Sequence, residues 1–243
     1  MNQLTRLIIV AHLFAVAGWA LAQEAIDSSP RALLDGAVAE LQAAESFRLE
    51  IEQTGEPYQL ALTLDGVNML PAALESAAAQ VISPDELHIS ARIRMFIPLS
   101  LDVYARVDRQ WLSFPSGAPW IPLPAFEGFD ISRLLAPDDG IDWALSNLRE
   151  ARVVPAETAL NEGDVWRIEA RAPAEAVEGL LFGLIAPQDD VAIDAYIGVD
   201  DGRLLRIEIL MLETVSDLGQ EPSVWHIKFY DYDAPRAFEP PDG

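Results

Sequence analysis

The sequence of 243 residues contains no cysteine. This absence excludes thiol catalysis, cysteine-based zinc sites and lipidation on an N-terminal cysteine. It also means that no disulfide bond stabilises the chain if it is exported. A chain of this length, 51% of it hydrophobic, can be stabilised by its core alone.

Basic residues are scarce, with 16 Lys and Arg against 39 Asp and Glu and a formal net charge of −23. Such an excess of negative charge repels phosphate backbones, so we expect no nucleic acid among the partners. It also repels anionic lipid head groups, which argues against a strong electrostatic attachment of the whole chain to a bilayer.

Long apolar runs are missing after the N-terminal segment. That segment has one base, Arg6, followed by residues 7–21, which carry no charge. This run of about 15 residues would form about 22 Å of helix, which is shorter than the hydrocarbon core of a membrane, about 30 Å thick. Ala20 and Ala22 form a small-x-small pair before Gln23. The pattern is typical of a secretory signal peptide cleaved after Ala22. The alternative is an uncleaved helix that anchors the chain in a membrane.

The remaining chain shows no internal repeat and no long Gly/Ser linker. We therefore predict a signal peptide over residues 1–22, one domain over residues 23–234 and a Pro-rich tail over residues 235–243, to which we assign no structure. This organisation implies an exported protein in the periplasm or another extracytoplasmic space.

Catalytic motifs are also missing: there is no G-x-S-x-G elbow, no H-E-x-x-H pair and no P-loop. Of three histidines, His12 lies in the predicted signal, and His88 and His226 occupy polar positions of strands far apart in sequence. We interpret the latter two as surface imidazoles. The sequence therefore predicts neither an enzyme nor a cofactor or metal site.

Two acidic runs have structural explanations. Asp138 and Asp139 lack the spacing of a calcium loop and are predicted to cap the helix that follows. Asp200, Asp201 and Gly202 lie between alternating segments, which predicts a hairpin turn.

Hydrophobic periodicity predicts an antiparallel α+β domain. A helix is expected from Ser29 and Pro30, with Leu34 and Val38 on its apolar face, and others near 141–150 and 173–187. Alternating segments predict strands with one apolar face, which the helices cover, and one wet face. Residues 71–84 fit a helix or an irregular strand equally well, because they are rich in alanine but flanked by strands. The strand segments are 47–53, 58–64, 86–97, 99–108, 109–115, 164–172, 191–212 and 223–233.

The second half of the last expected helix is apolar nearly all round, including Leu180, Leu181, Leu184 and Ile185. A helix lying on a sheet normally shows a polar face. This helix either is buried in an ordinary core or lines an apolar cavity.

Six stretches, in order, resemble the LppX/LprA/LprF/LprG family of bacterial envelope lipoproteins over about residues 30–241. They are "ISPDELHISARI", "VYARVDRQWLSFPSGAPW", "ISRLLAPDDGIDWALSNLREARVV", "APAEAVEGLL", "IDAYIGVDDGRLLRIEI" and "WHIKFYDYDAPRAFEPP". The resemblance implies a strongly curved antiparallel sheet, a half-barrel similar to LolA and LolB, with helices packed on its concave face. One departure is the sequence "ALAQ" where the family has a lipobox cysteine, which implies a secreted relative.

The resemblance also implies a non-enzymatic carrier that holds a multi-acylated lipid or glycolipid in an apolar cavity between sheet and helices, and that exchanges it with an envelope transporter or membrane protein. An alternative is an interaction or sensor module with the same fold and a filled core. A hydrolase lacks a nucleophile–base pair in this sequence. The candidate cavity residues are Leu180, Leu181, Leu184, Ile185, Ile89, Ile93, Leu101, Val103, Leu34 and Val38.

Overall fold

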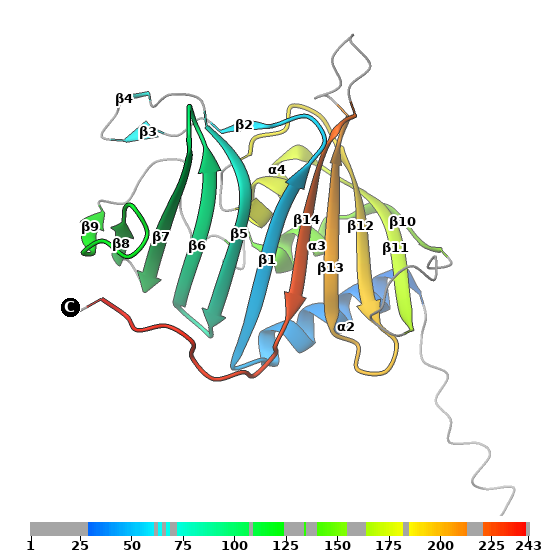
Figure 1. Cartoon of the computed structure of the whole chain (residues 1–243). Helices are drawn as coiled ribbons and strands as arrows, with labels where there is room; N and C mark the ends of the chain where they lie inside the picture. The colour runs from blue at the N-terminus through cyan, green and yellow to red at the C-terminus, as the bar shows by residue number, and fades with distance from the viewer. Residues whose placement is uncertain are drawn as a thin grey trace, which may run out of the picture.

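One large antiparallel sheet organises the chain (Figure 1). The computed structural model describes residues 29–60, 63–64, 67–68, 72–106, 109–123, 134, 140–154, 164–181, 185–212 and 221–241. Along the sheet the strands follow the order β10-β11-β12-β13-β14-β1-β5-β6-β7-β8-β9, and β2 pairs with β5 outside this path. The sheet is curved and does not close, so the expected α+β half-barrel is confirmed.

The strands of the sheet have the following bounds: β1 Ser46–Thr54, β2 Gln59–Leu60, β5 Ala72–Ile82, β6 Glu86–Arg94, β7 Pro98–Arg106, β8 Arg109–Ser113, β9 Ile121–Leu123, β10 Arg149–Val154, β11 Val165–Ala172, β12 Val191–Gly198, β13 Leu204–Met211 and β14 Ser223–Tyr230. A separate pair is formed by β3 (Thr63–Leu64) and β4 (Val67–Asn68). Strand β9 is short, and its three residues pair with β8.

Alternation along the strands separates the two faces of the sheet. In the central strand β1, Leu49 is buried and lies opposite Phe229 of β14 and Ala79 of β5. Its neighbour Glu50 is exposed on the other face. The same period of two recurs in the flanking strands, so one face is apolar and concave, and the other carries most of the charge.

Strand β5 resolves the ambiguity of the alanine-rich segment in favour of a strand. Ala77 and Ala79 point to the concave face, opposite Ile51 and Leu49 of β1, while Ala78 is exposed on the convex face. Helix propensity favours alanine by only about 0.7 kcal/mol per residue. Pairing with β1 on one side and β6 on the other overrides that preference.

Helix α2 (Pro30–Ala43) covers part of the concave face. It begins where predicted, because the Ser29 hydroxyl accepts a hydrogen bond from the amide of Ala32 at 3.3 Å. Leu34, Val38 and the other residues of the expected face are buried. The helix packs across β10, β12 and β13 and against α3 (Ile141–Ser146), behind the right-hand half of the sheet in Figure 1.

Helix α3 is shorter than predicted. It ends at Ser146, and Glu150 already belongs to the edge strand β10, with a left-handed φ of 54°. The Asn147 side chain bonds back to the Trp143 carbonyl at 2.8 Å, which helps to end the helix. The N-cap is Gly140, without a side-chain hydrogen bond, so the predicted cap by Asp138 or Asp139 was wrong. These two aspartates lie outside the described residues.

The last predicted helix is also shorter. Helix α4 spans Ala174–Glu178, and the 3₁₀ turn η2 follows over Gly179–Leu181. Ile185 lies in irregular backbone, and Leu184 lies outside the described residues. Because glycine is a poor helix former, Gly179 marks the point where the α-helix ends.

The C-terminal tail has no helix or strand between residues 231 and 241, yet it packs on the convex face of the sheet. The Gln80 side chain donates to the Pro235 carbonyl at 3.0 Å and accepts from the Ala237 amide at 2.8 Å. The ring of Phe238 stacks on His88 with centroids 4.7 Å apart. The tail thus covers aromatic residues of the convex face.

Candidate functional site

The concave side of β6 and β7 forms a continuous apolar wall. Ile89 lies directly opposite Val103, and Ala91 lies opposite Leu101. All eight inward positions of these two strands carry apolar side chains: Leu87, Ile89, Ala91, Ile93, Leu99, Leu101, Val103 and Ala105. Strand β5 extends the wall with Ala77 and Ala79. The wall offers dispersion contacts and no inward hydrogen-bonding side chain.

The wall is less filled than the other half of the concave face. Ala91, Leu99, Leu101 and Leu112 keep part of their surface accessible. In β12–β14 the inward residues Ile193, Ile209 and Trp225 are only 0–1% exposed. The difference follows from the position of α2, which lies over β10, β12 and β13.

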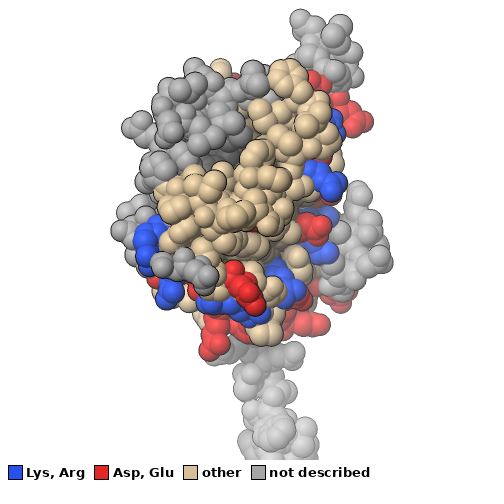
Figure 2. Space-filling model, turned by 60° about the vertical axis from the view of Figure 1, so that its left-hand side comes forward, with Lys and Arg blue, Asp and Glu red and all other residues tan. Residues whose placement is uncertain are grey.

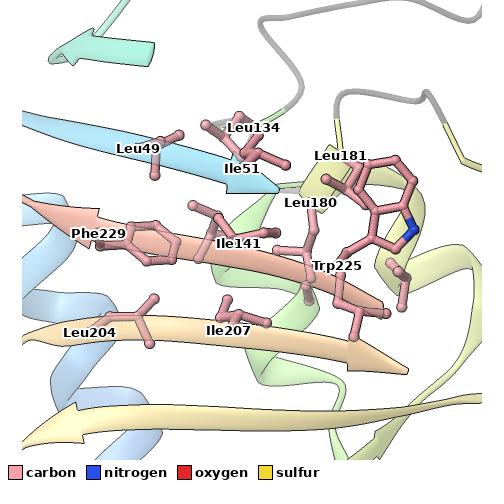
Figure 3. Packing of buried hydrophobic residues seen from close by; sticks show 14 of the residues in the cluster. Leu49, Ile51, Leu134, Ile141, Leu180, Leu181, Leu204, Ile207, Trp225 and Phe229 are labelled. Carbon is pink, nitrogen blue, oxygen red and sulfur yellow. The ribbon is translucent and has the colours of Figure 1, made fainter. Parts of the chain in front are cut away.

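The predicted cavity residues that the structure describes come from both halves, and they belong to or pack against one hydrophobic cluster. Leu34 and Val38 belong to α2, while Ile89, Ile93, Leu101 and Val103 belong to the wall. Leu180 and Leu181 lie beside the Trp225 indole, inside the densely packed half (Figure 3). Ile185 is 1% exposed, and Leu184 lies outside the described residues. Leu101 is half-buried, and the other described candidates are buried.

A polar hollow of about 380 Å³ lies on the other, convex face, between β1, β5, β6 and β7. Small outward residues leave this space, among them Ser76, Ala78, Ser90 and Ser100. Asp102 organises its rim by accepting hydrogen bonds from Ser90 at 2.7 Å and from Ser116 at 2.5 Å. Sequence reasoning missed this hollow, although the run of small residues at outward positions was its signal.

A hydrogen-bonded trio of an acid, a histidine and a hydroxyl crosses the convex face of β13, β14 and β1. His226 contacts Glu208 through Nδ1 at 3.2 Å and Thr54 through Nε2 at 3.2 Å. The bond with His226 lowers the pKa of Glu208. Sequence reasoning missed the trio because its members are distant in the chain. Thr54 is the last residue of a regular strand paired with Val224, so we interpret the trio as a cross-strand clamp.

Among the residues that the structure describes, no group of three or more histidines and acids is placed to hold a metal ion. No described helix combines the length and the apolar character that crossing a membrane requires.

Comparisons with known proteins agree with this architecture. A sequence model of the LppX_LprAFG lipoprotein family matches residues 29–236. The crystal structure of the Mycobacterium tuberculosis lipoprotein LppX aligns with 14% identity and a TM-score of 0.59, covering 88% of this chain and all of LppX. The structure of LprF from Mycobacterium bovis aligns with 13% identity and a TM-score of 0.63, covering 88% of this chain and 97% of LprF. At this identity the structures show the shared fold.

A LolA superfamily protein from Nitrosomonas europaea also aligns, with 11% identity, a TM-score of 0.30 and coverage of 86% of this chain and 94% of that protein. We base no conclusion on a similarity this low. No curated protein matches the sequence significantly.

Proposed function

Because the chain belongs to the LppX_LprAFG lipoprotein family, we propose that it is a non-enzymatic carrier that binds acyl chains between the sheet and the helices. The cargo is a multi-acylated lipid or glycolipid, which the protein exchanges with an envelope transporter or membrane protein. The protein acts outside the cytoplasm, and its signal peptide is cleaved after Ala22.

The observation that carries the proposal is the apolar, incompletely filled wall of β6–β8. An ordinary core buries its apolar residues fully, as the inward residues of β12–β14 are. Leu99, Leu101 and Leu112, at inward positions of their strands, are instead only partly buried. A wall of this kind suits a guest that is itself apolar.

The energetics of such a guest require no charged contact. Each methylene group removed from water contributes about 0.8 kcal/mol, so one acyl chain that buries about ten methylenes gains about 8 kcal/mol before its ordering costs. Acyl chains therefore suit a site that has no inward polar side chain. The head group of the lipid remains at the mouth of the half-barrel or in solvent.

Two alanines on adjacent strands supply a matched test. Ala91 points to the concave wall, whereas Ala78 is exposed on the convex face. The variant Ala91→Trp places an indole on the wall. If it displaces about four methylenes of a bound chain, acyl affinity falls by about 3 kcal/mol, or roughly 200-fold. Ala78→Trp leaves acyl affinity unchanged.

Binding is measured with a fluorescent fatty-acyl probe, and stability with urea unfolding of the same variants. If the core is filled instead, the wild type does not bind the probe. Ala91→Trp then overpacks the interior and lowers the free energy of unfolding by about 1–3 kcal/mol. That result would favour the interaction or sensor module over the carrier. Native mass spectrometry of protein purified from its own envelope identifies the cargo, and a sample without lipid would contradict the proposal.

The mature N-terminus tests the proposed release from the membrane. N-terminal sequencing of the purified protein should give Gln23 as the first residue. Detection of Met1 would instead indicate that the apolar segment is retained and anchors the carrier.

A further inference from the structure

The hairpin between β6 and β7 exposes two large apolar side chains at its tip. Phe96 is 83% exposed and Ile97 is 62% exposed, the two highest values among the large hydrophobic residues that the structure describes. The tip is an ordered turn, in which the Met95 amide donates to the Ile97 carbonyl at 3.3 Å. A soluble fold gains nothing from exposing both side chains side by side.

The tip extends past the end of β8, but β5 pairs with β6 as far as Arg94, just before the turn. The last pair between β5 and β6 joins Ala73 to Arg94, and the last pair between β7 and β8 joins Asp102 to Ser113. The Ser116 amide still donates to the Ser100 carbonyl at 2.9 Å, and beyond that point β6 is the one described strand that pairs with β7. Phe96 and Ile97 therefore lie at the end of a hairpin that β5 flanks on one side, while β8 stops short of them on the other.

The hairpin segment itself is basic, unlike the chain as a whole. From Leu87 to Leu101 the sequence has two arginines, Arg92 and Arg94, and no acidic residue, although the net charge of the chain is −23. Both arginines are exposed on the convex side of the hairpin. Arg94 forms an ion pair with Glu75 of β5, and Arg92 has no partner among the described residues. Figure 2 shows uncharged surface on this side of the molecule, with both basic and acidic side chains at its border.

We propose that the β6–β7 tip inserts into the surface of a phospholipid bilayer that contains anionic lipid. Phe96 and Ile97 enter the boundary between head groups and acyl chains, and Arg92 and Arg94 contact the phosphates, as in interfacial membrane anchors. The acidity of the remaining surface repels the same membrane and so limits contact to the tip. The apolar wall lies on the same two strands, so docking by the tip directs one end of the wall to the bilayer.

The test uses the full mature protein and sedimentation with sucrose-loaded vesicles, made either of phosphatidylcholine alone or of phosphatidylcholine and phosphatidylglycerol in equal parts. The double variant Phe96→Ser/Ile97→Ser should reduce partitioning to both kinds of vesicle about 10- to 100-fold, because it removes the apolar insertion. Arg92→Gln should reduce binding to the anionic vesicles about fivefold and leave binding to the neutral vesicles unchanged.

Val199→Ser is the control, since Val199 is also exposed (37%) but lies in the turn between β12 and β13, at the opposite end of the sheet (Figure 1). It should bind vesicles like the wild type. Wild-type protein that does not sediment with either vesicle, or a double variant within twofold of the wild type, overturns the proposal.

The acyl probe of the preceding section separates docking from cargo binding. The tip variants should retain its affinity, because neither side chain belongs to the wall. If the wild type binds vesicles but does not bind the acyl probe, the carrier proposal is contradicted and the docking proposal remains supported.

Discussion

The packing of the C-terminal tail leads to a prediction for Arg236→Ala. The guanidinium of Arg236 pairs with Glu86 at 2.5 Å, and the Glu86 side chain is only 6% exposed. Tyr104 donates to the other carboxylate oxygen at 3.0 Å. The substitution therefore leaves a buried carboxylate with the Tyr104 hydrogen bond and without its ion-pair partner.

The magnitude follows from the exposure of the two groups. Removal of one partner of a fully buried pair costs about 3–5 kcal/mol. Arg236 is 40% exposed, so water replaces part of the interaction, and we expect a loss of about 2 kcal/mol. This figure includes the contact of the guanidinium with the Phe238 ring, 5.4 Å from its centroid, which contributes about 0.5 kcal/mol.

Urea unfolding measures this loss, and a double-mutant cycle with Glu86→Gln isolates the pair. The neutral amide still accepts the Tyr104 hydrogen bond, so Arg236→Ala should cost at least 1 kcal/mol less in the Glu86→Gln background. Such measurements are accurate to about 0.5 kcal/mol. If the free energy of unfolding of Arg236→Ala lies within about 0.5 kcal/mol of the wild-type value, our account of the tail is refuted.

Three further predictions concern stability. Burial lowers the pKa of His88 below 6.5, so at acidic pH the unfolded chain binds more protons than the folded chain. The free energy of unfolding should therefore fall as the pH drops from about 7 to about 5. The same pH series on the variant His88→Gln should show a smaller fall. Gly55 has a φ of 75°, and an added Cβ would overlap the Pro222 carbonyl oxygen. Gly55→Ala should therefore lower the free energy of unfolding by more than about 2 kcal/mol, seen as a lower midpoint of urea unfolding. An unchanged midpoint would exclude this clash. The pKa of Glu208 is lowered from 4.5 in the folded chain, so its contribution to the free energy of unfolding should be complete above pH 4.5 and lost as the pH falls through the folded value. By thermal unfolding, Glu208→Gln should be about 1 kcal/mol less stable than the wild type at about pH 7. The difference should vanish once the Glu208 carboxylate of the folded wild type is protonated.

Much of the fold was predictable because its signals are local. The Ser29 cap, the apolar face of α2 and the alternation in β1, β6 and β7 all depend on residues within a few positions of one another. The hairpin turn at Asp201 and Gly202 is equally local, with Gly202 at a φ of 67° and the Asp201 carboxylate bonded to the Arg203 amide at 3.1 Å. Patterns of this kind define an element before any tertiary contact forms.

Predictions failed where distant residues decide the outcome. Residues 147–150 lie at the end of a helical pattern, yet Arg149 pairs with Arg171 at the sheet edge. The trio of Thr54, His226 and Glu208 exists only because β1, β14 and β13 are neighbours. Of the candidate cavity residues, Leu180 and Leu181 were chosen for an apolar pattern that an ordinary core produces as well.

The sequence by itself determined the class of the fold, the apolar face of each strand and the family, because periodicity and ordered motifs are properties of the chain. Only the tertiary structure decided that the alanine-rich segment is a strand, that the tail closes over an aromatic cluster and that Phe96 and Ile97 are exposed at the tip of a hairpin. Each of these depends on which segments lie side by side, and pairing across the sheet contributes more free energy than the local preference of any one segment.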